Sequence, residues 1–181
     1  MKYIKTLISA LFAVTLLVSV AVAAPSTNAP LVSSPAGLGE WTVSLAGGGS
    51  TAFNSNDQDA TVVGGEVQIG HAAKLILPLE VGVRQGVGYA NSGNSSWLLS
   101  TRIYSDVVLV KFGNLQFDAG ANVGVIYGNT TLTWVAAPEV VGRLYLKKDV
   151  DLFARVEYPF NLNEGKAENR LDYTIGCRIR F

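Results

Sequence analysis

Acidic residues and arginines recur at alternate positions along much of the chain. The residues that share this pattern are Glu66, Glu80, Arg84, Arg102, Asp106, Asp118, Glu139, Arg143, Asp151, Arg155, Glu157, Arg170, Asp172, Arg178 and Arg180. Two carboxylates brought together could carry acid–base catalysis. No lysine belongs to the set, however, and arginine is the cation that pairs best with carboxylates in a crowded interior. We therefore expect these side chains to form an ion-pair network and not a catalytic pair.

Other chemistry-bearing residues are scarce. The chain has one histidine, His71, and one cysteine, Cys177, so neither a disulfide nor a metal site built from these residue types is expected. We expect His71 to be a solvated turn residue in the segment HAAK. The loop NSNDQD, residues 54–59, lacks the glycine and distal glutamate of a calcium loop. These patterns predict no catalytic residue, no cofactor and no metal, and the protein is not expected to be an enzyme.

The elements that position the charged residues have the two-residue period of β-strands. Eight such stretches are expected, at residues 40–48, 60–70, 75–89, 97–110, 115–128, 132–146, 150–160 and 169–181. The connections alternate between mostly long polar segments and short ones. That alternation is typical of an up-and-down barrel with one rim outside the cell and the other in the periplasm. Pro78, Pro138 and Pro159 fall within these stretches, where we expect bulges or shortened pairing.

The second face of each stretch is apolar. In the last stretch Leu171, Ile175 and Ile179 alternate with the charged series, and the upstream stretches behave in the same way. A soluble sandwich would carry lysine and glutamate on its wet face, whereas here the lysines lie in turns and at the strand ends. We therefore predict an all-β, eight-stranded antiparallel transmembrane barrel with lipid outside and charges inside. A secreted calycin-like carrier is the soluble alternative.

Aromatic residues gather near the ends of the apolar faces. The predicted membrane girdles consist of Trp41, Tyr89, Trp97, Tyr127, Trp134, Tyr158, Phe160 and Phe181. Amphipathic rings prefer the headgroup level of a bilayer, so two aromatic belts are expected. A soluble core would instead distribute its rings along the strands.

The start of the chain predicts export. Residues 1–23 combine two lysines, an apolar run and an Ala-Val-Ala cleavage site, which together indicate a signal peptide. Residues 24–39 are rich in proline and serine and are expected to form a flexible arm, and residues 40–181 form the barrel. A formal net charge of +0 argues against nucleic-acid binding. The predicted location is the bacterial outer membrane.

With these features the chain resembles the small eight-stranded outer-membrane barrels, the family of the outer-membrane protein A barrel domain and its short relatives. The resemblance covers residues 40–181 and is most specific in the last strand, with Tyr173, Ile175, Ile179 and the terminal Phe181. It implies that these residues form the signal read by the barrel assembly machinery. Cys177 within the outward series departs from the family pattern.

The resulting functional hypothesis is an integral outer-membrane protein with a structural, surface-interaction or adhesion role and a plugged, salt-bridged lumen. Eight strands enclose little more volume than their side chains fill, so a wide pore is not expected. The expected partners are outer-membrane lipid, lipopolysaccharide and an extracellular ligand bound by the loops. A narrow porin-like channel for ions or small solutes is the alternative, and an enzyme acting on lipid is a further one.

Overall fold

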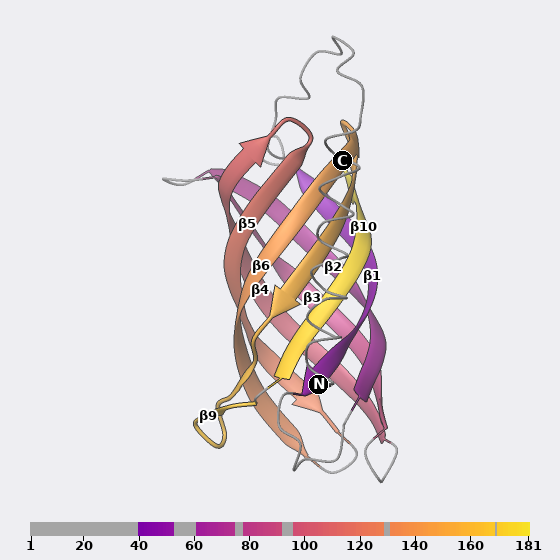
Figure 1. Cartoon of the computed structure of the whole chain (residues 1–181), viewed down its shortest axis with the longest axis vertical. Helices are drawn as coiled ribbons and strands as arrows, with labels where there is room; N and C mark the ends of the chain where they lie inside the picture. Colours follow the sequence, from indigo (N-terminus) through magenta and orange to yellow (C-terminus); the bar gives the residue numbers. More distant parts are fainter. Residues whose placement is uncertain (1–39, 53–60, 75–77, 92–95, 129–130, 169) are drawn as a thin grey trace, which may run out of the picture.

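The protein folds as a β-barrel, shown in Figure 1 as a computed structural model. The structure describes residues 40–52, 61–74, 78–91, 96–128, 131–168 and 170–181. The strands are β1 (Trp41–Ala52), β2 (Thr61–Lys74), β3 (Pro78–Asn91), β4 (Ser96–Phe112), β5 (Leu115–Tyr127), β6 (Leu132–Lys147), β7 (Val150–Glu157), β8 (Phe160–Asn161), β9 (Lys166–Ala167) and β10 (Arg170–Arg180). Among the described residues no helix is long and apolar enough to cross a membrane. The predicted signal peptide and arm lie outside these residues.

The sheet closes on itself through antiparallel pairs only. Each of β1 to β6 pairs with the next, and β10 pairs with both β7 and β1, so the eight strands β1 to β7 and β10 form the wall. The β1–β10 ladder runs from Thr42 opposite Arg180 to Ala52 opposite Arg170. Trp41 and Phe181 then exchange two backbone hydrogen bonds of 3.0 and 3.1 Å. The predicted fold class is therefore confirmed, and the last residue of the chain completes the seam.

The seventh crossing strand is shorter than the sequence predicts. Its ladder with β6 stops at Glu157, one more backbone hydrogen bond runs from the Tyr158 N–H to the Pro138 carbonyl at 3.2 Å, and the ladder resumes at Phe160 in β8. Pro159 lies in this gap and lacks the N–H that a continuous ladder needs. β8 then pairs with β9 in a small hairpin whose turn contains Gly165, at a φ of 66°. Figure 1 shows this hairpin at the end of the barrel opposite the C-terminus.

The rim that holds the C-terminus has short turns. The β4–β5 hairpin turns through Gly113, whose φ of 55° suits glycine, and a bulge between Val108 and Val110 shifts the register before it. The prediction that His71 lies in a turn is wrong, because β2 continues to Lys74 and pairs His71 with Trp41. The strand extends beyond the predicted boundary because His71 pairs with both β1 and β3, and residues 72–74 continue the ladder with β3.

The two faces of the wall differ as the alternation predicts. Outward side chains are apolar and exposed, with Leu45 at 69%, Ile103 at 62% and Ile175 at 59%. Inward side chains are mostly charged or polar and buried, including Arg84, Asp151 and Arg178. This arrangement is the reverse of a soluble protein, and it fits a barrel with acyl chains outside.

Candidate functional site

The middle of the lumen is filled by a cluster around Arg84. Its two Nη atoms donate to the two carboxylate oxygens of Glu139 at 2.6 Å each, and Nη1 also reaches Glu157 at 3.2 Å. Asn122 donates to Glu139 at 2.7 Å, and the guanidinium of Arg84 lies 4.1 Å from the ring centroid of Tyr104. Strands β3, β5, β6, β7 and β4 supply these residues, so the cluster ties most of the wall together.

A second cluster fills the lumen toward the short-turn rim. Glu80 accepts hydrogen bonds from Thr42 at 3.1 Å, from Tyr104 at 2.9 Å and from Arg178. Arg178 also donates to Asp151 at 2.8 and 2.9 Å. Every one of these side chains is buried, so each charge is stabilised by protein groups and not by bulk water.

Arg143 and Arg180 enlarge this second cluster near the short-turn rim. Arg143 pairs with Asp118 and with Asp106, the latter at 3.1 Å, and Arg180 donates to Asp151 at 2.8 Å. The ring of Tyr145 lies against the guanidinium of Arg180, 4.4 Å from the ring centroid. Together the two clusters form what we call the plug, made of residues 80, 84, 106, 118, 139, 143, 151, 178 and 180.

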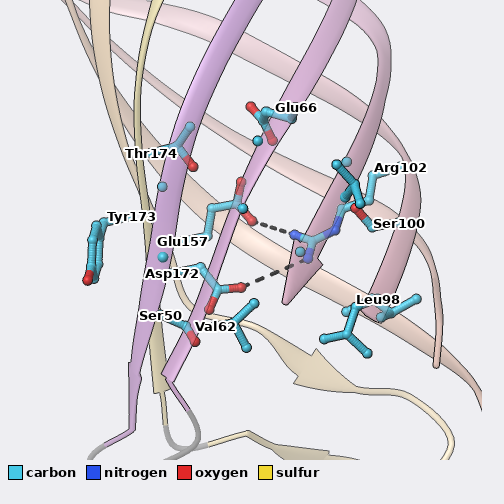
Figure 2. Close-up of a pocket in the computed structure, with 18 of the residues that line it drawn as sticks. Ser50, Val62, Glu66, Leu98, Ser100, Arg102, Glu157, Asp172, Tyr173 and Thr174 are labelled. Atoms are coloured by element: carbon cyan, nitrogen blue, oxygen red, sulfur yellow. Dashed lines mark hydrogen bonds and ion pairs between the residues drawn. The ribbon is translucent and has the colours of Figure 1, made fainter. Parts of the chain in front are cut away.

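The loop side of the lumen holds a series of linked ion pairs. Arg155 contacts Glu66 at 2.6 Å and Glu157 at 2.5 Å. Figure 2 shows Arg102 reaching from β4 between Glu157 and Asp172, at 2.5 and 3.9 Å. Acids and bases alternate along this series, so its charges are balanced locally.

On the loop side of the plug, these residues line an open cavity of about 120 Å³, which we call the vestibule. Glycines form part of its wall, namely Gly48, Gly49, Gly64, Gly65, Gly86 and Gly88. Gly48, Gly64, Gly86 and Gly88 are inward positions, and the absence of side chains there leaves a space of the kind that side chains fill in the plug. Ser50 also lines the vestibule, and its buried hydroxyl has no hydrogen-bond partner within the described residues.

The structure places every residue of the predicted ion-pair network on the inner face. The vestibule is lined by Glu66, Arg102, Arg155, Glu157, Arg170 and Asp172, and the others lie in the plug. Sequence reasoning missed Tyr104 and Tyr145, which occupy inward positions between the charged residues and are buried. Each tyrosine lies two residues after an inward arginine of its strand, Arg102 in β4 and Arg143 in β6, and this spacing was the signal in the sequence.

The predicted girdle residues lie on the outer face near the strand ends. On the loop side, Tyr89 and Trp97 meet edge to face at 5.3 Å, and Tyr158 and Phe160 do the same at 5.3 Å. The other members are Tyr127, Trp134, Trp41 and Phe181, all exposed. Their role as membrane girdles remains a prediction.

The predicted assembly signal forms the outer face of β10. Tyr173, Ile175, Ile179 and Phe181 are exposed there, with the free Cys177 among them. Recognition of this face by the assembly machinery remains a prediction.

The single histidine faces outward and does not approach the lumen carboxylates. The His71 ring lies 4.8 Å from that of Trp41, and its buried Nδ1 has no hydrogen-bond partner within the part of the chain that the structure describes. In the same described segments, no group of three or more His, Cys, Asp or Glu side chains could hold a metal ion. The polar groups of the lumen are thus arranged for mutual pairing.

Solved structures share this fold. Neisserial surface protein A gives a TM-score of 0.55 at 13% identity, over 78% of this chain and 96% of that one. A major outer membrane protein from Thermus thermophilus gives 0.51 at 14% identity, over 80% and 100%. The N-terminal β-barrel domain of Pseudomonas aeruginosa OprF gives 0.49 at 14% identity, over 77% and 97%. No protein-family model and no curated protein matches the sequence.

The chain therefore has the fold of the small eight-stranded outer-membrane barrels, and the predicted resemblance is confirmed at the level of fold. An apolar outer face and this fold together assign the protein to the bacterial outer membrane.

Proposed function

We propose that the protein acts through its surfaces, as a structural and surface-interaction or adhesion barrel of the outer membrane, and that it is not an enzyme. The observation that carries the proposal is the plug, whose paired charges occupy the middle of the lumen. A barrel whose interior is filled by its own ion pairs presents only its lipid-facing wall and its rims to other molecules. Its outer-rim loops are then the parts available for an extracellular ligand.

The hairpin of β8 and β9 is held in place by side-chain hydrogen bonds. Asn161 accepts hydrogen bonds from the backbone N–H groups of Asn163 and Glu164 at 3.0 and 3.3 Å. Asn163 in turn donates to the carbonyl of Leu132 at 2.9 Å and accepts from the N–H of Trp134 at 3.2 Å. These bonds hold the hairpin against β6 and present Leu162 to the exterior, 50% exposed. A fixed, partly apolar loop is suited to contact a partner at low entropic cost.

Lipid is the first partner of the wall, and lipopolysaccharide remains a proposed partner of the outer rim. The exposed cations Lys147, the last residue of β6, and Lys148, in the β6–β7 turn, lie at the short-turn rim. These lysines favour contact with anionic headgroups of the periplasmic leaflet. Contact with lipopolysaccharide phosphates would instead involve residues of the loop rim, at the other end of the barrel.

The test uses the full chain in two assays. In planar bilayers the wild type is expected to conduct no steady ion current, because the plug closes the lumen. On intact cells, replacing residues 162–165 by a four-residue Gly/Ser turn is expected to lower attachment to a panel of immobilised glycans and proteins, while heat-modifiable gel migration stays unchanged. Cells without the protein provide the baseline. Attachment equal to that baseline for the wild type would reject the adhesion role.

A narrow channel is the second candidate function, because the lumen contains free space in the vestibule and also within the plug. A small void of about 10 Å³, the space of one water, lies within the plug beside Arg84, Asp106 and Arg143. The buried Oδ1 of Asp106 has no partner in the described part of the structure, so it is suited to bind such a water. A steady current in the wild type that Glu139→Ala or Arg155→Ala changes would support this candidate over the plugged barrel.

A further inference from the structure

Two polar side chains face outward in the middle of the apolar wall. The hydroxyl of Thr101 donates to Oε1 of Gln85 at 2.7 Å, and the two residues are paired across β3 and β4. Gln85 is exposed on the outer face, four residues from Tyr89 at the loop end of β3. At about 3.3 Å per residue and a tilt of about 45°, this places the amide roughly 9 Å below that ring, inside the apolar band.

The surroundings of this pair are apolar. Val83, Val87, Leu99 and Ile103 flank it on the two strands and are all exposed. Ser105, one further exposed polar residue, lies four positions along β4. In the middle of the other described strands, the outward positions hold apolar residues, glycine or Cys177. The polar outward residues are thus concentrated on one wall, formed by β3 and β4.

The hydrogen bond with Thr101 does not satisfy the amide. Thr101 uses its proton to reach Oε1, and nothing within the described residues accepts from Nε2 of Gln85. Acyl chains offer no acceptor, so an amide N–H₂ left in hydrocarbon is costly. Such a group is expected to lie against another polar group of a protein.

We propose that the β3–β4 wall is the contact surface between two copies of this chain in the membrane, with Gln85 and Thr101 at its centre. A carboxamide is complementary to itself, because it carries both a donor and an acceptor. Across a twofold axis, Nε2 of each Gln85 donates to Oε1 of the other, which still accepts from its own Thr101. The contact is isologous, so it closes at a dimer.

The shape of the wall allows two copies to approach. Gly65 pairs with Val87 on one side of the polar pair, and the exposed Ala121 pairs with Ser105 on the other. Small residues at both edges let neighbouring backbones come close, which favours packing within a bilayer.

The chain contains a matched control for the test. Cys177 is exposed on β10, which pairs with β7, on the side of the ring of strands opposite β3 and β4. In vesicles of phospholipid at low protein density, a short thiol-reactive crosslinker should not dimerise the wild-type chain through Cys177. The variant Cys177→Ser/Ile103→Cys should crosslink in high yield. Adding Gln85→Leu should weaken the dimerisation constant about tenfold, because two membrane hydrogen bonds are lost.

Folding can be followed separately, because Gln85→Leu places an apolar residue on an apolar face and should keep heat-modifiable migration. Equal crosslinking at positions 103 and 177 would overturn the proposal, as would a yield at position 103 that Gln85→Leu leaves unchanged. In cells, a crosslink from position 103 to a different protein and not to a second copy would reject the choice of partner.

Discussion

Replacing Arg84 by methionine tests whether the plug stabilises the barrel. The guanidinium bonds both oxygens of Glu139 at 2.6 Å, and the two side chains are only 3% and 0% exposed. Removing one partner of such a buried pair typically costs about 3–5 kcal/mol, since the remaining carboxylate stays buried without its cation. Lost stacking on Tyr104 adds about 0.5–2 kcal/mol. We expect Arg84→Met to lower the free energy of unfolding by about 4 kcal/mol.

The assay is reversible urea unfolding of the full chain in lipid vesicles, followed by tryptophan emission and by heat-modifiable migration. The double variant Arg84→Met/Glu139→Leu removes both charges and should recover most of the loss, because replacing a buried pair by apolar residues is often neutral. Arg170→Met is the matched control, since the side chain is 23% exposed at the vestibule and its pairs should contribute no more than about 1 kcal/mol. A loss below about 1 kcal/mol for Arg84→Met, or a double variant less stable than the single one, would refute this reasoning.

Three further expectations concern other parts of the barrel. Tyr104→Phe deletes a 2.9 Å hydrogen bond to Glu80 and should cost about 1.5–3 kcal/mol in the same unfolding assay. Gly124→Ala should destabilise the barrel by about 1–3 kcal/mol, because a Cβ there would overlap a backbone carbonyl of β4. Gly142→Ala, whose Cβ would meet only the Phe117 ring at 3.5 Å, should be tolerated, and equal effects of the two substitutions would contradict the packing argument. Phe181→Ala should slow insertion of the chain into outer membranes, measured as the heat-modifiable fraction after pulse labelling, and unchanged kinetics would remove its role in assembly.

The facing of the strands could be predicted from the sequence because side chains alternate strictly across a sheet. Once the parity of Arg178 and Ile175 is known in β10, every charged residue of that strand is assigned to the lumen. The same rule predicts inward positions for Glu66, Arg102 and Glu139 without any knowledge of their partners. Closure was predictable too, because an open edge has no hydrogen-bond partners in lipid.

The pairing inside the lumen could not be predicted in this way. Arg84 and Glu139 are 55 residues apart, and they meet because strand tilt and register bring inward positions of β3 and β6 to one height. Register in turn depends on local events such as the bulge at Val108–Val110. The outward position of Gln85, by contrast, was available from parity.

Glycine divides the lumen into two parts with different properties. In the plug, arginine side chains span the interior and bind carboxylates from opposite walls, and the void beside Arg84, Asp106 and Arg143 holds only about 10 Å³. In the vestibule, the inward positions of neighbouring strands include Gly48, Gly64, Gly86 and Gly88. The series of ion pairs that links Arg155 to Arg170 therefore lies beside an open space. The pairs of Arg102 and Arg170 with Asp172, whose side chains are 12%, 23% and 18% exposed, can therefore exchange partners with water, whereas those of the plug cannot. It follows that raising the salt concentration should weaken the contribution of Arg102 and Arg170 to stability while leaving that of Arg84 almost unchanged.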